Sequence, residues 1–174
     1  MRLPVFLLAA LLTALTIPTA DAQRAPIDPR FGVGFDLIGG FPGQNLVPSG
    51  LGVGVRGRVS IPFNADVSFA ADAGLAGFVL GGRESATYLF NPQVSAIITL
   101  PRGRTAARYL LGGVGGYLPL GTSGAASGGP ALHAGLGWAF PLQETSVYVE
   151  VNPALVIGGS ESTVVLPVRA GIIF

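Results

Sequence analysis

Apolar residues recur at every second position along most of the chain, which is the period of a β-strand. Between residues 51 and 61, for example, Leu51, Val53 and Val55 alternate with glycine and arginine. Eight segments share this alternation, and each is close to the ~10 residues that a tilted membrane-spanning strand needs. They are residues 31–38, 51–61, 66–78, 88–100, 107–117, 131–140, 146–156 and 164–174.

The connections between these segments alternate in kind. Short turns that contain proline follow the second, fourth and sixth segments, at residues 62–64, 101–104 and 141–144. Longer loops rich in glycine and serine follow the odd segments, at residues 39–50, 80–86, 119–130 and 158–162. Short turns at one end and longer loops at the other are typical of transmembrane barrels. We therefore predict an all-β fold, a closed antiparallel up-and-down barrel of eight strands, in which segment 31–38 pairs with segment 164–174.

The charged residues of the eight segments indicate which face lies inside. We assign them all to the face opposite the large apolar residues, although Leu110 and Val114 share a face with the arginine of the fifth segment. That face is otherwise mostly Gly, Ala and Ser, which suits a narrow interior, and four arginines balance four acids. We expect an ion-pair network that plugs the lumen, made by Asp36, Arg56, Arg58, Asp66, Asp72, Arg108, Glu150 and Arg169.

The apolar face is then expected to contact lipid. Aromatic residues near the segment ends suggest girdles at the two membrane interfaces. At one rim we place Phe31, Tyr109, Trp138, Phe140 and Phe174, and at the other Phe41, Phe78, Tyr88 and Tyr117. The alternative is a soluble barrel or sandwich with a lipocalin-like pocket, in which the two faces are reversed.

Composition and the N-terminus add an export signal to this picture. The chain is 49% hydrophobic and only 11% charged, with a mean hydropathy of +0.60. Residues 1–22 combine a positive start, an apolar run and an A-x-A site, which is typical of a cleaved signal peptide. The alternative, a single anchoring helix, needs ~20 apolar residues, and this run is shorter. We expect a signal peptide at 1–22, a periplasmic leader at 23–30 and a barrel domain at 31–174.

The sequence offers little for catalysis or cofactor binding. Cysteine is absent, which excludes disulfides and thiol chemistry, and the net charge of +1 argues against nucleic acid. His133 is the only histidine, no serine lies beside it in sequence, and we interpret it as a satisfied interior residue. Residues 52–57 match G-x-G-x-x-G, but strand alternation runs through them, so the match is accidental. We expect no catalytic residues, metal or cofactor.

Residues 31–174 resemble the small outer-membrane β-barrels of the OmpA/OmpX-like superfamily, most specifically in the last third of the chain. The resemblance rests on residues 109–117, 134–142, 149–151 and 166–174. Phe174, a terminal phenylalanine on an alternating strand, resembles the signal that the outer-membrane assembly machinery recognises. The resemblance implies outer-membrane location, contact with lipids and that machinery, and we expect a monomer.

Such a fold does not by itself determine function. We favour a non-enzymatic barrel with a structural or surface-interaction role. Two alternatives stay open at this point: a conduit for small apolar molecules, and a lipid-modifying enzyme that would use His133.

Overall fold

The computed structural model describes residues 28–40, 46–48, 50–80, 87–100, 106–120, 126–159 and 161–174, so the expected signal peptide lies outside the described residues. Within these ranges no helix is long and apolar enough to cross a membrane. The strands are β1 (Arg30–Gly40), β2 (Gly50–Pro62), β3 (Val67–Leu80), β4 (Thr87–Thr99), β5 (Ala107–Leu120), β6 (Gly129–Pro141), β7 (Ser146–Val151), β8 (Ala154–Ile157) and β9 (Ser162–Ile173).

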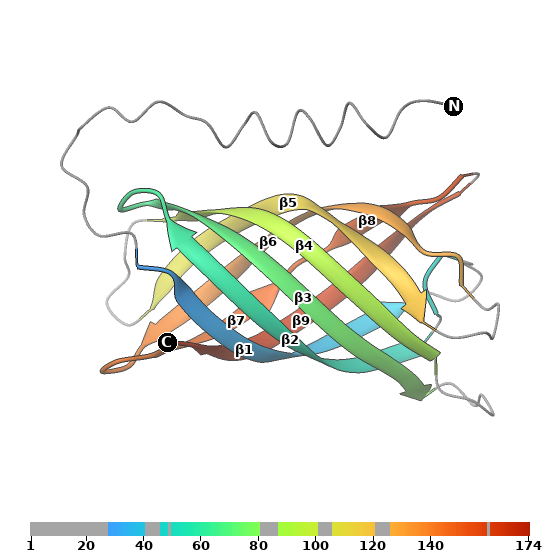
Figure 1. The fold of residues 1–174 in the computed structure, drawn as a ribbon, viewed down its shortest axis with the longest axis horizontal. Coiled ribbons are helices and arrows are strands. Elements are labelled where there is room, and N and C mark those ends of the chain that lie inside the picture. Colours follow the sequence, from blue (N-terminus) through green and yellow to red (C-terminus); the bar gives the residue numbers. More distant parts are fainter. Residues whose placement is uncertain are drawn as a thin grey trace.

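The strands form one closed antiparallel barrel, as the alternation predicts (Figure 1). Each strand from β1 to β6 pairs with the next, β7 pairs with β9, and β1 closes the sheet against β9 from Gly32↔Ile173 to Gly39↔Leu166. The chain end at Phe174 lies at the same end as the turns after β2 and β6, which we call the turn end. The opposite end is the loop end.

The seventh of the eight barrel strands is interrupted and forms two segments. Strands β7 and β8 both lie between β6 and β9, and they are separated only by Asn152 and Pro153. Proline has no N–H to give to a strand ladder, so regular pairing stops there. Flanking bonds hold the gap, because Asn152 N donates to the Pro167 carbonyl at 3.0 Å and Ala134 N donates to the Pro153 carbonyl at 3.1 Å. Nine strand segments thus make an eight-stranded barrel.

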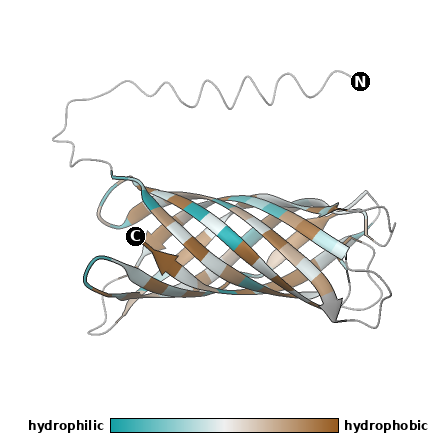
Figure 2. Cartoon of the chain, turned by 60° about the horizontal axis from the view of Figure 1, so that its bottom comes forward, coloured by the Kyte–Doolittle hydropathy of each residue, from teal (hydrophilic) through white to brown (hydrophobic). Residues whose placement is uncertain are grey.

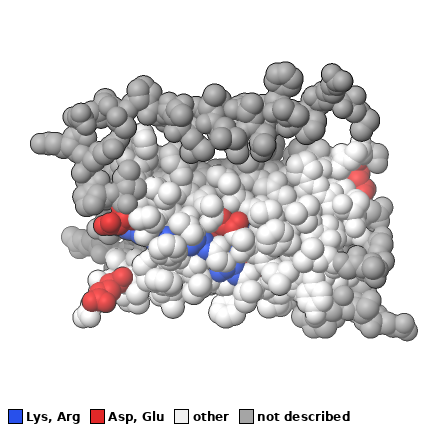
Figure 3. Space-filling view, in the orientation of Figure 1, with Lys and Arg blue, Asp and Glu red and all other residues white. Residues whose placement is uncertain are grey.

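Side-chain exposure alternates along the strands with the large apolar residues outside. Phe35 is 67% exposed, whereas its neighbour Asp36 is 1% exposed. The same contrast appears along β2, where Val55 is 56% and Arg56 3% exposed. Figure 2 shows hydrophobic and polar residues alternating along the strands. In Figure 3, most of the described surface is neither acidic nor basic. This is the pattern of a transmembrane barrel, and it is the reverse of the soluble alternative.

Strand β5 corrects one prediction about the two faces. Tyr109 and Tyr117 were expected outside, but they are 7% and 0% exposed and lie in the lumen with Leu111, which is 4% exposed. Arg108 is instead exposed on the outer face. The reason is that the glycines of β5 have no side chain to mark either face. The expectation for Phe78 is also wrong, since its ring is buried inside at 3% exposure. Phe41 lies outside the described residues.

An apolar cluster fills the lumen at the loop end. It includes Leu46 and Val47 of the connection between β1 and β2, each 2% exposed. The Leu46 carbonyl accepts a hydrogen bond from Gly128 N at 2.9 Å, which ties this connection to the one before β6. The other members are Ile38, Ala76, Phe78, Leu89, Tyr117, Ala131, Ala154, Val156 and Val165.

Candidate functional site: the charged layer of the lumen

A layer of buried charged residues crosses the middle of the lumen. It lies between the apolar cluster and the turn end, and each of its members is at most 5% exposed. Three arginines balance three acids. They come from five strands and are Asp36, Arg56, Arg58, Asp72, Glu150 and Arg169.

Asp36 and Arg56 form the first ion pair of this layer. Arg56 Nε lies 3.0 Å from both carboxylate oxygens of Asp36, and Arg56 Nη2 lies 2.7 Å from Oδ2. The same Nη2 donates to Asn91 Oδ1 at 2.6 Å. Both ionic partners are buried, and a buried ion pair is destabilising unless its polar groups are well satisfied. The close geometry and the extra hydrogen bond to Asn91 meet this requirement.

Arg58 contacts two acids on different strands, Asp72 and Glu150. Its Nε donates to Asp72 Oδ1 at 2.7 Å, and its two terminal nitrogens donate to the two carboxylate oxygens of Glu150, with Nη2–Oε2 at 2.9 Å. The guanidinium lies 5.0 Å from the ring centroid of Tyr148. Tyr109 also donates to Glu150, with its hydroxyl 2.8 Å from Oε1. Glu150 is therefore bonded by two residues and fully buried.

Arg169 completes the layer beside the closure of the barrel. Its Nε lies 3.6 Å from Asp36 Oδ1, and its Nη1 lies 3.8 Å from Glu150 Oε2. These are ion pairs beyond hydrogen-bond distance. Its Nη2 donates a hydrogen bond to Gln93 Oε1 at 2.8 Å. Arg169 is therefore held more loosely than Arg58.

Glycines in the wall make room for the tyrosines that surround this layer. A Cβ at Gly137 would lie 2.3 Å from a ring carbon of Tyr109. A Cβ at Gly34 would lie 2.5 Å from the Tyr148 hydroxyl. Close contacts of this kind explain why so many inward positions are glycine.

The structure brings together six of the eight residues expected in the network and leaves two apart. Asp66 lies exposed in the turn before β3, where its N–H donates to Asn64 Oδ1 at 2.9 Å. Because β3 begins one residue later, at Val67, Asp66 lies among the residues that line the lumen at the turn end and not among the buried charges. Arg108 faces outward, because the parity of β5 is opposite to the one expected.

His133 has polar partners on both ring nitrogens. Asn152 Oδ1 lies 3.1 Å from Nδ1, and Ser95 Oγ lies 3.5 Å from Nε2. No serine lies beside this histidine in sequence, but Ser95 lies beside it in space. Ser95 and His133 both lie in register with Gly113, which has no side chain to keep them apart. Sequence reasoning missed this contact, because the sequence alone does not show which residues of β4 and β6 lie in register with Gly113.

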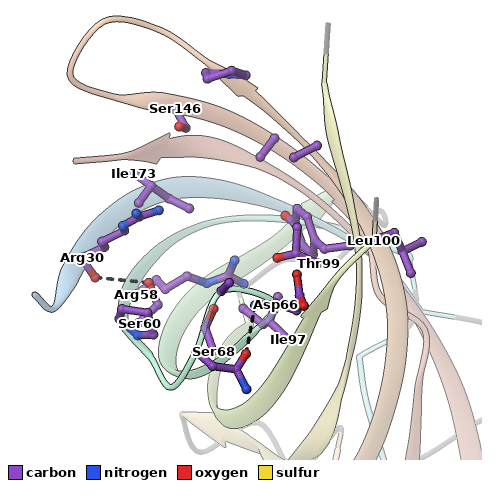
Figure 4. Close-up of a pocket in the computed structure, with 17 residues that line it drawn as sticks. Arg30, Arg58, Ser60, Asp66, Ser68, Ile97, Thr99, Leu100, Ser146 and Ile173 are labelled. Carbon is purple, nitrogen blue, oxygen red and sulfur yellow. Dashed lines mark hydrogen bonds between the residues drawn. The ribbon is translucent and has the colours of Figure 1, made fainter. Parts of the chain in front are cut away.

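A polar cavity of about 530 Å³ occupies the lumen at the turn end. Figure 4 shows Arg58, Ser60 and Asp66 among the residues that line it. Arg30, Thr99 and Tyr109 contribute further polar groups to the wall. The Ser95–His133–Asn152 group does not line this cavity. Among the described residues, no group of three or more His, Asp and Glu could hold a metal ion.

An apolar exterior, a closed antiparallel sheet and a charged interior define this chain as a small transmembrane β-barrel. No protein-family model matches the sequence, and no curated protein matches it. Solved structures do: Neisserial surface protein A (NspA) is 14% identical with a TM-score of 0.64, over 83% of this chain and 94% of that one.

Two further solved barrels are similar. Ail, the attachment invasion locus protein of Yersinia pestis, is 14% identical with a TM-score of 0.51, over 84% of this chain and 97% of that chain. The N-terminal β-barrel domain of Pseudomonas aeruginosa OprF is 12% identical with a TM-score of 0.50, over 82% and 97%. The fold is thus that of the small outer-membrane barrels, as the resemblance implied. At these identities the likeness defines the fold and leaves the function to be argued from the site.

Proposed function

We propose that this protein is a non-enzymatic integral barrel of the bacterial outer membrane, with a structural or surface-interaction role and a lumen closed to solutes. The observation on which this rests is the charged layer, in which Arg58 connects β2 to β7 across the lumen while Arg56 pairs with Asp36 on β1. The apolar cluster at the loop end forms a second barrier.

The closed lumen argues against a conduit for apolar molecules. Such a molecule would have to cross the loop-end cluster and then displace paired charges. Separating those charges is costly in a narrow interior, where water cannot replace the lost partners. The charged layer and the apolar cluster thus both lie between the cavity at the turn end and the loop end.

The surroundings of His133 argue against a lipid-modifying enzyme. Ser95, His133 and Asn152 are linked in the order of a nucleophile, a base and an orienting group. Their exposed fractions are only 2%, 5% and 0%, so a lipid chain has no route to the serine. The linkage instead satisfies polar groups inside the wall, as buried polar groups require.

The outer loops favour the structural role over binding of a polyanion. Ail has been solved in complex with the heparin analogue sucrose octasulfate. In this chain the four loops at the loop end contain a single basic residue, Arg83, against Glu84 and Glu161. A sulfated partner would find little positive charge there.

Export and assembly complete the proposal. The signal at 1–22 directs the chain across the inner membrane, and the leader at 23–30 and the turn end then lie in the periplasm. Phe174 is 58% exposed beside the closure, where its N–H and carbonyl both bond to Phe31. It presents the terminal aromatic group to the assembly machinery, and the finished barrel is a lipid-embedded monomer.

Single-channel recording in planar bilayers tests the closed lumen. The folded wild-type protein, with its β-structure verified by circular dichroism, should give no steady conductance. A steady open level would overturn the closed-lumen proposal and would favour the conduit. Loss of conductance after heat denaturation of the same sample would show that such a level came from the folded barrel.

A further inference from the structure

Arg108 is exceptional among the charged residues of the described strands, because it alone belongs to the outer, lipid-facing side of the wall. Exposure along β5 alternates, with Arg108 and Leu110 exposed and Tyr109 and Leu111 buried. The other charged strand residues at mid-barrel all point into the lumen. Among the described residues no hydrogen bond or ion pair is found for Arg108, so its charge on the apolar side is open to a partner from outside the protein.

The residue opposite Arg108 across the sheet is Trp138, the single tryptophan of the chain. Directly opposed side chains of antiparallel strands lie on the same side of the sheet, with their Cβ atoms about 4.5–5.5 Å apart. Trp138 faces outward between Leu136 and Phe140, which are both 42% exposed. The arginine and the indole therefore occupy neighbouring positions on the outer surface.

This pair marks the edge of the apolar belt. Arg108 is the second residue of β5, and β6 ends at Pro141, three residues after Trp138. The next outward row toward the loop end is Ile98, Leu110 and Leu136, all apolar. The pair thus lies where hydrocarbon gives way to lipid headgroups at the turn end.

We propose that Arg108 and Trp138 form a binding site for the phosphate group of a phospholipid in the leaflet at the turn end. The guanidinium offers paired N–H donors that match phosphate oxygens. The indole rests on the acyl region and directs its N–H toward the polar layer, which is the usual place of tryptophan at a membrane interface. The inference rests on the proposed function only in that the barrel must be inserted in a bilayer.

Solid-state NMR on phospholipid vesicles in phosphate-free buffer tests the contact directly. Protein labelled with ¹⁵N-arginine should show a guanidinium signal that is attenuated by the lipid ³¹P, and this signal should be missing in Arg108→Gln. Arg30→Gln is the matched control, because Arg30 lies at the same end but lines the cavity inside the barrel. An attenuated signal that persists in Arg108→Gln, or that disappears only in Arg30→Gln, would overturn the proposal.

The fluorescence of Trp138 separates this failure from a failure of membrane insertion. Lipids brominated near the headgroup should quench Trp138 more strongly than lipids brominated near the chain ends. Stronger quenching from the chain ends would place the pair in the membrane interior and overturn the site while leaving insertion intact. No quenching from either depth would contradict insertion itself.

Discussion

Arg58 and Glu150 are 92 residues apart in sequence and lie on strands that do not pair, yet the Arg58 guanidinium contacts both carboxylate oxygens of Glu150. Asp72 accepts from the remaining Nε, so a single side chain holds two distant parts of the wall. Arg169 lies beside the same carboxylate at a longer distance of 3.8 Å. Glu150 therefore has a close partner in Arg58 and a more distant partner in Arg169. Mutation of each arginine can separate their contributions to stability.

Glu150→Ala should lower the free energy of unfolding by about 3–5 kcal/mol, because Arg58 keeps a buried charge without its main partner. The double variant Arg58→Ala/Glu150→Ala should recover part of that loss, and Glu150→Ala/Arg169→Ala should recover less. Urea unfolding in lipid vesicles measures both cycles. Glu144→Ala, in the exposed turn after β6, is the control and should be close to neutral. Strictly additive losses would mean that the Arg58–Glu150 pair contributes nothing.

Gly137→Ala should destabilise the barrel by about 1–3 kcal/mol, the usual cost of overpacking a filled interior. The reason is the predicted collision of the new methyl group with the ring of Tyr109, 2.3 Å away. Gly57→Ala is the matched control, since a Cβ there meets nothing within 4 Å. Thermal unfolding monitored by circular dichroism compares them, and equal effects would contradict the close packing of Tyr109.

Val55→Arg should cost about 2–4 kcal/mol if Val55 lies near the bilayer midplane, where a charge on the lipid face is least tolerated. Val55 is 56% exposed at the middle of β2. Leu142→Arg, in the turn after β6 and 60% exposed, should cost little because it lies at the polar rim. Unfolding in vesicles is the measurement. A tolerant Val55→Arg variant would show that this face does not meet lipid.

The whole protein should sediment with outer membranes and stay there after washing with high salt. The basis is the exterior of exposed apolar side chains, whose contact with lipid is not an ionic attachment that salt could release. Density fractionation followed by immunoblotting makes the comparison, with a periplasmic protein as the washing control. Recovery in the soluble periplasm would contradict membrane insertion.

Most of the barrel follows from the alternation of side chains because a strand with one apolar face has a single consistent orientation. Strand β2 shows this well, with Val53 and Val55 on one side and Arg56 on the other. The same argument failed in β5, where Gly112 and Gly113 break the contrast between faces. Pro153 marks the break between β7 and β8. The alternation of residues 146–156 continues past this proline, so the sequence predicted one unbroken strand there.

The ion pairs were predictable only as a group. Alternation places Arg58 inside, but a long side chain can reach past its neighbours, so the partner depends on the lumen's width and on which residues are glycine. The contact between Ser95 and His133 has the same origin, since it crosses β5 over Gly113. Sequence spacing cannot show a contact that skips a strand.

The closure of the barrel is marked by charge. Three of its residues lie in one row across neighbouring strands. Asp36 lies opposite Arg169 across the seam, the pairing of β1 with β9, and Arg169 lies opposite Glu150 of β7. A seam shifted by one residue would turn Asp36 toward lipid, and a shift by two would place Pro167 or Gly171 opposite it. Each wrong alignment separates Asp36 from Arg169 and so removes the ion pair across the seam, which favours the correct register where the first and last strands meet.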